Sequence, residues 1–136
     1  MDKNVLIDIS TRTTDTDGIS EFEMSIVGKY QKKNNDYIIE YIEQGMDSTK
    51  TTITFGKGVN ILRQGAYFSN IRIERGKRWQ SLYHTPYGEA TVATTADEID
   101  YKLDDDGGKA TLKYALDIDG QLASFYEMDI NVAPVG

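Results

Sequence analysis

The chain has 136 residues, a net charge of −7 at pH 7 and no cysteine. The lack of cysteine excludes a disulfide framework and any metal site built on thiolates. An acidic surface repels phosphate backbones and anionic lipid headgroups, so we expect neither nucleic acid nor membrane as a partner. The length suits one domain, predicted to span residues 1–136.

No targeting segment is predicted from the sequence. Residues 1–4 lead directly into strand-like sequence without the apolar core of a signal peptide. No apolar run reaches the length of a membrane-spanning helix. We therefore expect a cytoplasmic protein.

Alternation of apolar and polar residues predicts strands along most of the chain, because successive side chains of a strand point to opposite faces. No segment has a convincing helical period, and at most one turn of helix is expected between Gly76 and Gly88. In chain order, the apolar faces are predicted to carry Val5, Ile7 and Ile9; Phe22, Met24, Ile26 and Tyr30; Tyr37, Ile39 and Tyr41; Ile53 and Phe55; Ile99, Tyr101 and Leu103; Leu112, Tyr114, Leu116 and Ile118; and Leu122, Tyr126, Met128, Ile130 and Val132.

Turn residues separate these runs. Asp119 and Gly120 predict a two-residue type I′ hairpin, and such short connections make neighbouring strands antiparallel. A two-residue turn at Gly65 would place Ile71 and Ile73 on the wrong face relative to Ile61. Either a longer loop or a β-bulge is expected there.

The predicted fold class is all-β, an antiparallel up-and-down meander of about 8–10 strands. Closure into a barrel of the calycin or lipocalin type removes the two exposed edges of such a sheet; a two-sheet sandwich is the alternative. A barrel of about eight strands is either filled by side chains or holds one small ligand. Five tyrosines that share faces with aliphatic residues fit both interpretations: Tyr30, Tyr41, Tyr101, Tyr114 and Tyr126.

A basic cluster stands out in an otherwise acidic chain, and Trp79 lies next to it. A guanidinium beside an aromatic ring binds anionic or aromatic ligands through charge and stacking. The alternative is a cluster at a hairpin end that pairs with Glu74 and other surface carboxylates. The cluster consists of Arg72, Arg75, Lys77 and Arg78.

Two acidic turns, residues 15–18 and 104–107, suggest calcium loops but lack the ligand spacing of an EF-hand. No metal site is therefore expected. The sequence also contains no nucleophile elbow and no phosphate-binding glycine loop, so we predict no catalytic residue and no cofactor.

Several segments carry a family resemblance in their order and spacing: residues 3–7, 61–65, 76–78, 82–88, 101–104, 107–108 and 119–121. Together they are similar to the YwiB-like family of uncharacterised bacterial proteins. This resemblance implies a calycin-like β-barrel in a bacterial cytosol, and it implies no activity. The Gly-x-Trp pattern of lipocalins is absent, so a transport role would rest on fold analogy alone.

Such a barrel could have one of three functions. We favour a non-enzymatic module that binds a small anionic or amphipathic molecule near Arg63, Arg78, Trp79, Tyr83, His84 and Tyr87. The second function is a filled barrel whose residues 72–79 dock a protein partner or a second copy of the chain. The third is an enzyme that uses His84 with a tyrosine or carboxylate within about 3 Å.

Overall fold

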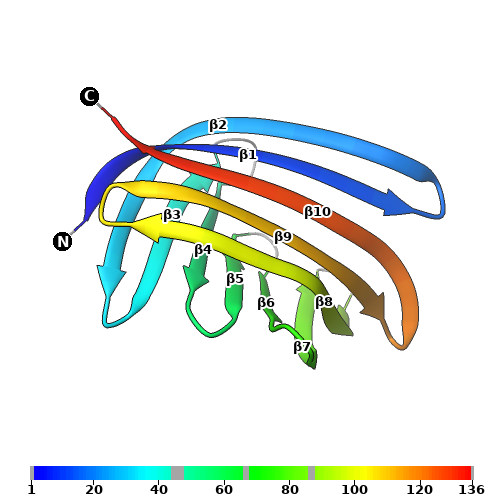
Figure 1. Cartoon of the computed structure of the whole chain (residues 1–136). Helices are drawn as coiled ribbons and strands as arrows, with labels where there is room; N and C mark the ends of the chain where they lie inside the picture. The colour runs from blue at the N-terminus through cyan, green and yellow to red at the C-terminus, as the bar shows by residue number, and fades with distance from the viewer. Residues whose placement is uncertain (1, 44–47, 66–67, 86–87, 136) are drawn as a thin grey trace.

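The computed structural model describes residues 2–43, 48–65, 68–85 and 88–135, with only the backbone given for residues 82–85. The strands form an antiparallel meander that closes into a barrel, because β1 also pairs with β10 (Figure 1). The predicted all-β barrel is confirmed, and the sandwich alternative is wrong. The strands are β1 (Lys3–Asp15), β2 (Gly18–Lys33), β3 (Asp36–Glu43), β4 (Thr49–Phe55), β5 (Val59–Gln64), β6 (Phe68–Ile73), β7 (Arg78–Thr85), β8 (Gly88–Asp104), β9 (Gly107–Ile118) and β10 (Gln121–Pro134).

Closure depends on β1, which lies between β2 and β10 (Figure 1). Its residues 5–15 pair with β10 and its residues 3–15 pair with β2. The weakest seam within the described chain is between β6 and β7, which are joined through Phe68 and Ser69 alone. The barrel is therefore nearly closed, with few paired residues between β6 and β7.

The two walls of the barrel differ in strand length. Strands β1, β2, β8, β9 and β10 have 12–17 residues, whereas β3–β7 have 6–8. The long strands form the curved upper wall in Figure 1 and extend beyond the short ones. At Gly28 the backbone of β3 passes so close that a Cβ atom would overlap the Glu40 carbonyl oxygen. From Gly28 back to Gly18, β2 pairs with β1 alone among the described strands. The barrel is open at the end where this part of β2 lies.

At the opposite end β1 begins and β10 ends (Figure 1). This end is filled by side chains. The Tyr30 hydroxyl donates to the Asp104 carbonyl at 2.6 Å, and the Tyr101 hydroxyl donates to the Gly56 carbonyl at 2.8 Å. These two tyrosines therefore belong to the filled core. The fully buried side chains around them include Val5, Ile7, Ile39, Ile53, Phe55, Val59, Ile73 and Leu112.

Two turn predictions are resolved by the backbone. Asp119 and Gly120 both have positive φ, 50° and 86°, and they connect the paired residues Ile118 and Gln121. This confirms the two-residue hairpin with its type I′ signs. After β5, Gln64 pairs with Phe68 and Ile61 pairs with Ile71, so the connection is longer than a two-residue turn and the isoleucines share a face. Residues 66–67 of this connection lie outside the described residues.

Two local features differ from what the alternation pattern predicted. Residues 78–85 form strand β7, where no strand was predicted and at most one turn of helix was expected. The described chain has no helix long and apolar enough to cross a membrane. Leu122 was placed on the apolar face with Tyr126, but the register of β10 shifts between Leu122 and Ser124. This irregularity turns Leu122 outward, where it is 56 % exposed.

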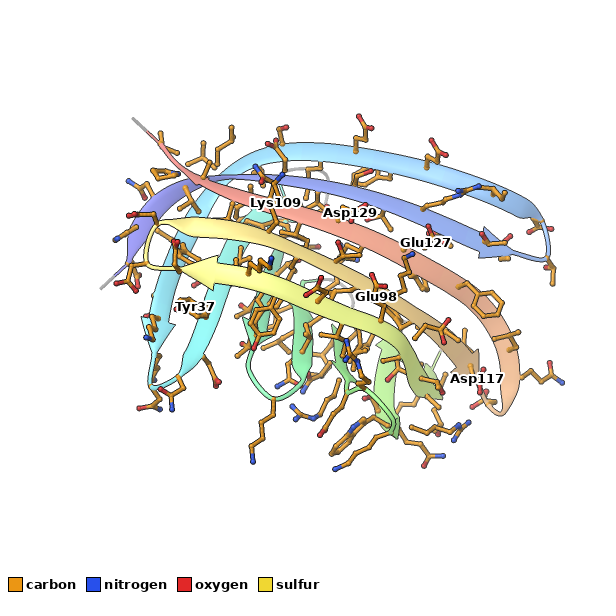
Figure 2. The ribbon with its side chains drawn as sticks, in the orientation of Figure 1. Tyr37, Glu98, Lys109, Asp117, Glu127 and Asp129 are labelled. Carbon is orange, nitrogen blue, oxygen red and sulfur yellow. The ribbon has the colours of Figure 1, made fainter. Side chains whose placement is uncertain are left out.

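Charged side chains cover the outer surface of the long strands. Figure 2 shows Glu98, Lys109, Asp117, Glu127 and Asp129 on the outside of β8, β9 and β10. Opposite charges on neighbouring strands favour one register over its alternatives. One row across β2, β1, β10, β9 and β8 alternates in sign: Glu21, Arg12, Glu127, Lys113 and Glu98.

Candidate functional site

The open end of the barrel contains a cavity of about 550 Å³. This volume is typical of small-molecule sites. The wall is formed by inward-facing side chains of β1–β6 and β8–β10. The barrel is thus half filled and half hollow, which combines the two interpretations of its interior. The apolar lining includes Ile9, Met24, Ile53, Ile61, Ile71, Val92, Leu116 and Met128.

The wall formed by the short strands is apolar deep in the cavity and polar near the open end. Its inner row is made of four isoleucines in register: Ile39, Ile53, Ile61 and Ile71. The next inward-facing row toward the open end is polar in all four strands: Tyr41, Thr51, Arg63 and Ser69. We call this second row the polar belt. Because inward residues recur every second position, one step along four paired strands separates the two rows.

Arg63 and Glu43 are the only charged residues among the described residues that line the cavity. Arg63 Nη2 donates to Glu43 Oε1 at 3.0 Å, and both side chains are partly exposed. A guanidinium carries five donors in a planar fork, so this single bond leaves donors for a second acceptor. Arg63 can therefore bind an acceptor group of a molecule inside the cavity.

Tyrosine hydroxyls complete the polar lining. Burial raises the pKa of Tyr114 well above its usual value, the neighbouring Tyr126 acts in the same direction, and Arg63 opposes both. The rings of Tyr114 and Tyr126 stack with centroids 5.1 Å apart. Burial and the carboxylate of Glu43 raise the pKa of Tyr41, against the Thr51 hydroxyl and Arg63. Tyr41 and Tyr114 are therefore neutral hydrogen-bonding groups at ordinary pH.

Stability should fall as pH rises above about 10. The buried tyrosines keep their protons in the folded state, whereas in the unfolded chain they lose them near pH 10, so the folded state then binds more protons. Each such tyrosine contributes a slope of up to about 1.4 kcal/mol per pH unit. Urea denaturation between pH 9 and 11 checks this. Tyr114→Phe should flatten the slope, and an unchanged slope would contradict the assigned burial effect.

The structure places the candidate arginines and tryptophan in different environments. Arg63 lines the cavity, as described above. Arg78 lies on the outer surface of β7, where its Nη2 donates to Asp117 Oδ2 at 3.2 Å. Trp79 is partly buried beneath the guanidinium of Arg72, whose central carbon lies 4.9 Å from the ring centroid. Neither Arg78 nor Trp79 is among the described residues of the cavity wall.

The remaining candidates are described in part or not at all. Tyr83 and His84 belong to β7, where they pair with Ala90 and Glu89, and the structure gives their backbone only. Tyr87 lies outside the described residues. The distance from His84 to a polar group, which the enzyme hypothesis requires, also involves side chains outside the described part.

The rest of the basic cluster is engaged in surface contacts. Arg72 donates to Asn60 Oδ1 at 3.2 Å and to Glu74 Oε2 at 3.3 Å, and Lys77 pairs with Glu74 at 3.5 Å. Arg75 donates to the Ile99 carbonyl at 2.7 Å. These contacts agree with the interpretation of a hairpin-end cluster, whose exposed ion pairs contribute little to stability.

Sequence reasoning missed several residues of the site. Glu43, Thr51 and Ser69 were not singled out, although they lie beside Arg63. Each is an ordinary polar residue in its own strand. A signal appears only when the four short strands are aligned in register. That alignment could not be made from the sequence, because a longer loop and a β-bulge were both possible at Gly65.

Comparison with known proteins agrees with this architecture. The family model described as "Domain of unknown function (DUF1934)" matches residues 7–130. The "Uncharacterized beta-barrel protein YwiB" of Bacillus subtilis (strain 168) is 26 % identical over 102 residues, which cover 74 % of this chain and 72 % of that protein. The crystal structure of the ywiB protein from Bacillus subtilis superposes with a TM-score of 0.88 at 21 % identity, over 99 % of this chain and 94 % of that one.

Proposed function

Since the chain belongs to the family of the domain of unknown function DUF1934, we propose its function from its own cavity: it binds a small amphipathic molecule. The apolar part of this molecule lies against Ile53, Ile61 and Ile71 of the inner row, which line the cavity. Its polar or anionic head group lies at the polar belt, against Arg63. The observation that carries the proposal is this step from an apolar interior to the guanidinium of Arg63 at the mouth.

Binding, and not catalysis, is the activity that the described lining supports best. The two charged groups of the described lining, Arg63 and Glu43, are paired with each other, and such a pair suits recognition of a polar head group. Small-ligand binding inside a barrel also suits the likeness to calycins that the sequence predicts, which is an analogy of fold. We place this activity in the cytoplasm, the setting that the family resemblance of the sequence implies.

The test uses decanoate, an amphipathic probe with one carboxylate, measured by isothermal titration calorimetry. Arg63→Gln should weaken decanoate binding about tenfold to a hundredfold, because a hydrogen bond to a charged group contributes about 1.5–3 kcal/mol. Glu43→Gln should strengthen it, because the variant removes the carboxylate that competes for Arg63. Arg78→Gln is the matched control and should leave binding unchanged, because Arg78 pairs with Asp117 on the outer surface.

Two results would contradict the proposal. One is equal weakening of decanoate binding by Arg63→Gln and Arg78→Gln, since that would indicate a general charge effect. The other is the absence of decanoate binding together with a clean apo mass of the freshly purified protein by native mass spectrometry. A bound molecule retained from the expression host would be identified in the same mass measurement.

A further inference from the structure

Strand β2 has an edge that no other described strand covers. Its residues 29–33 pair with β3, and its residues 18–30 pair with β1. Residues 18–27 therefore have a partner on one side only within the described chain. In Figure 1 this half of β2 runs along the rim of the barrel, past the ends of the short strands.

The hydrogen-bonding pattern shows which backbone groups face this edge. Residues 15 and 18 close a two-residue hairpin, and residues 33 and 36 close another. In such hairpins the closing pair is hydrogen-bonded and every second pair along the strands follows it. The even-numbered residues of β2 therefore bond to β1, and the odd-numbered ones bond to β3. Beyond β3, the N–H and C=O groups of residues 19, 21, 23, 25 and 27 point to the uncovered side.

The side chains along the same edge alternate in character. Glu21 and Glu23 lie on the outer face, while Phe22 and Met24 line the cavity on the inner face. Phe22 is 56 % exposed even though it faces inward, because β1 is the one described strand that pairs with it. Ile19 and Val27, at the two ends of the uncovered segment, are 57 % and 58 % exposed. This edge thus offers backbone bonds, an apolar inner side and an acidic outer side.

We propose that the uncovered edge of β2 binds an extended segment of a partner protein whose side chains alternate between basic and apolar. The segment adds as a further strand and bonds to the backbone of the odd-numbered residues, as in β-strand addition. Its apolar side chains pack against Phe22 and Met24 at the open side of the cavity. Its lysines or arginines lie opposite Glu21 and Glu23, and this charge complementarity selects the partner.

A second copy of the chain fits this edge poorly. The two antiparallel registers that overlap most of the uncovered segment are those about Phe22 and about Glu23. Pairing about Phe22 sets Glu21 of one copy opposite Glu23 of the other. Pairing about Glu23 sets the two Glu23 residues opposite each other. Like charges directly opposite are destabilising, and acidic residues on an edge protect proteins from such self-association. Each copy also carries a net charge of −7.

The test uses a capped, fluorescently labelled peptide of alternating lysine and valine, about ten residues long, which matches the uncovered segment. Fluorescence anisotropy should show binding at low salt that weakens as salt is added. A peptide with glutamate in place of lysine should bind at least tenfold more weakly. On addition of the lysine peptide, amide hydrogen exchange should slow at residues 19, 21, 23, 25 and 27.

Two variants of one residue separate backbone from charge effects. Glu23→Pro removes an N–H that faces the uncovered side and leaves the bonds of β2 to β1 intact, because proline is tolerated on an edge. Glu23→Ala removes the same charge and keeps the N–H. We expect Glu23→Ala to weaken binding several-fold and Glu23→Pro to weaken it at least tenfold further. Circular dichroism and thermal unfolding confirm that both variants are folded.

Several outcomes would overturn the inference: no binding of the lysine peptide at millimolar concentration, equal binding of the glutamate peptide, or no difference between the two variants. Dimers in size-exclusion chromatography whose odd-numbered β2 amides are protected would assign the edge to a second copy instead. Arg63→Gln should not change peptide binding. The edge and the cavity can therefore be confirmed or rejected independently.

Discussion

Replacing Gly108 by alanine should destabilise the protein by at least about 4 kcal/mol, a large share of the total stability of a typical domain. Gly108 has a φ of +145°, which side-chain-bearing residues rarely adopt. An added Cβ would overlap the Lys102 carbonyl oxygen and lie 3.1 Å from the Leu103 Cα. Both contacts are backbone atoms of β8, which cannot move without breaking its pairing with β9.

Chemical denaturation followed by circular dichroism measures this loss. Gly18→Ala is the matched control, because Gly18 also has a positive φ, +120°, but nothing lies within 4 Å of an added Cβ. The control should lose only the cost of backbone strain, of order 1–3 kcal/mol. If the two variants were equally stable, steric overlap with β8 would not be the reason that glycine is required at position 108.

Leu112→Ala should cost about 2–5 kcal/mol. Leu112 is fully buried in the middle of β9, where it pairs with Met128 of β10 and Ile99 of β8. Truncation removes apolar contacts from the filled half of the barrel and leaves a void that three paired strands hold open. The Leu112 side chain does not line the cavity, so the variant should lose stability but still bind decanoate through Arg63.

The same substitution at Leu122 provides the comparison, because Leu122 is 56 % exposed on the outside of β10. Surface substitutions of this kind usually change stability by less than about 0.5 kcal/mol. Urea midpoints of the two variants, measured under identical conditions, give the difference directly. A Leu112→Ala midpoint as high as that of Leu122→Ala would mean that the filled half of the barrel is not the main source of stability.

Much of the candidate site could not be predicted from the sequence because it depends on pairing across strands. Arg78 and Trp79 were proposed as neighbours of one ligand, yet adjacent residues of a strand point to opposite faces. Arg78 lies outside on β7, paired with Asp117. Arg63, which was proposed to lie near a ligand entrance, lines the cavity, but its neighbours Tyr41, Thr51 and Ser69 come from three other strands.

The sequence by itself determined most of the strands, most of their buried faces and the hairpin at Asp119, because alternation and turn chemistry are local properties of the chain. Only the tertiary structure decided where the barrel is hollow and where an edge is exposed. The reason is geometric: the long strands extend beyond the short ones, so inward-facing residues such as Phe22 lose their neighbours across the barrel. Strand length and register across the whole barrel, and not any single segment, produce the cavity and the uncovered edge.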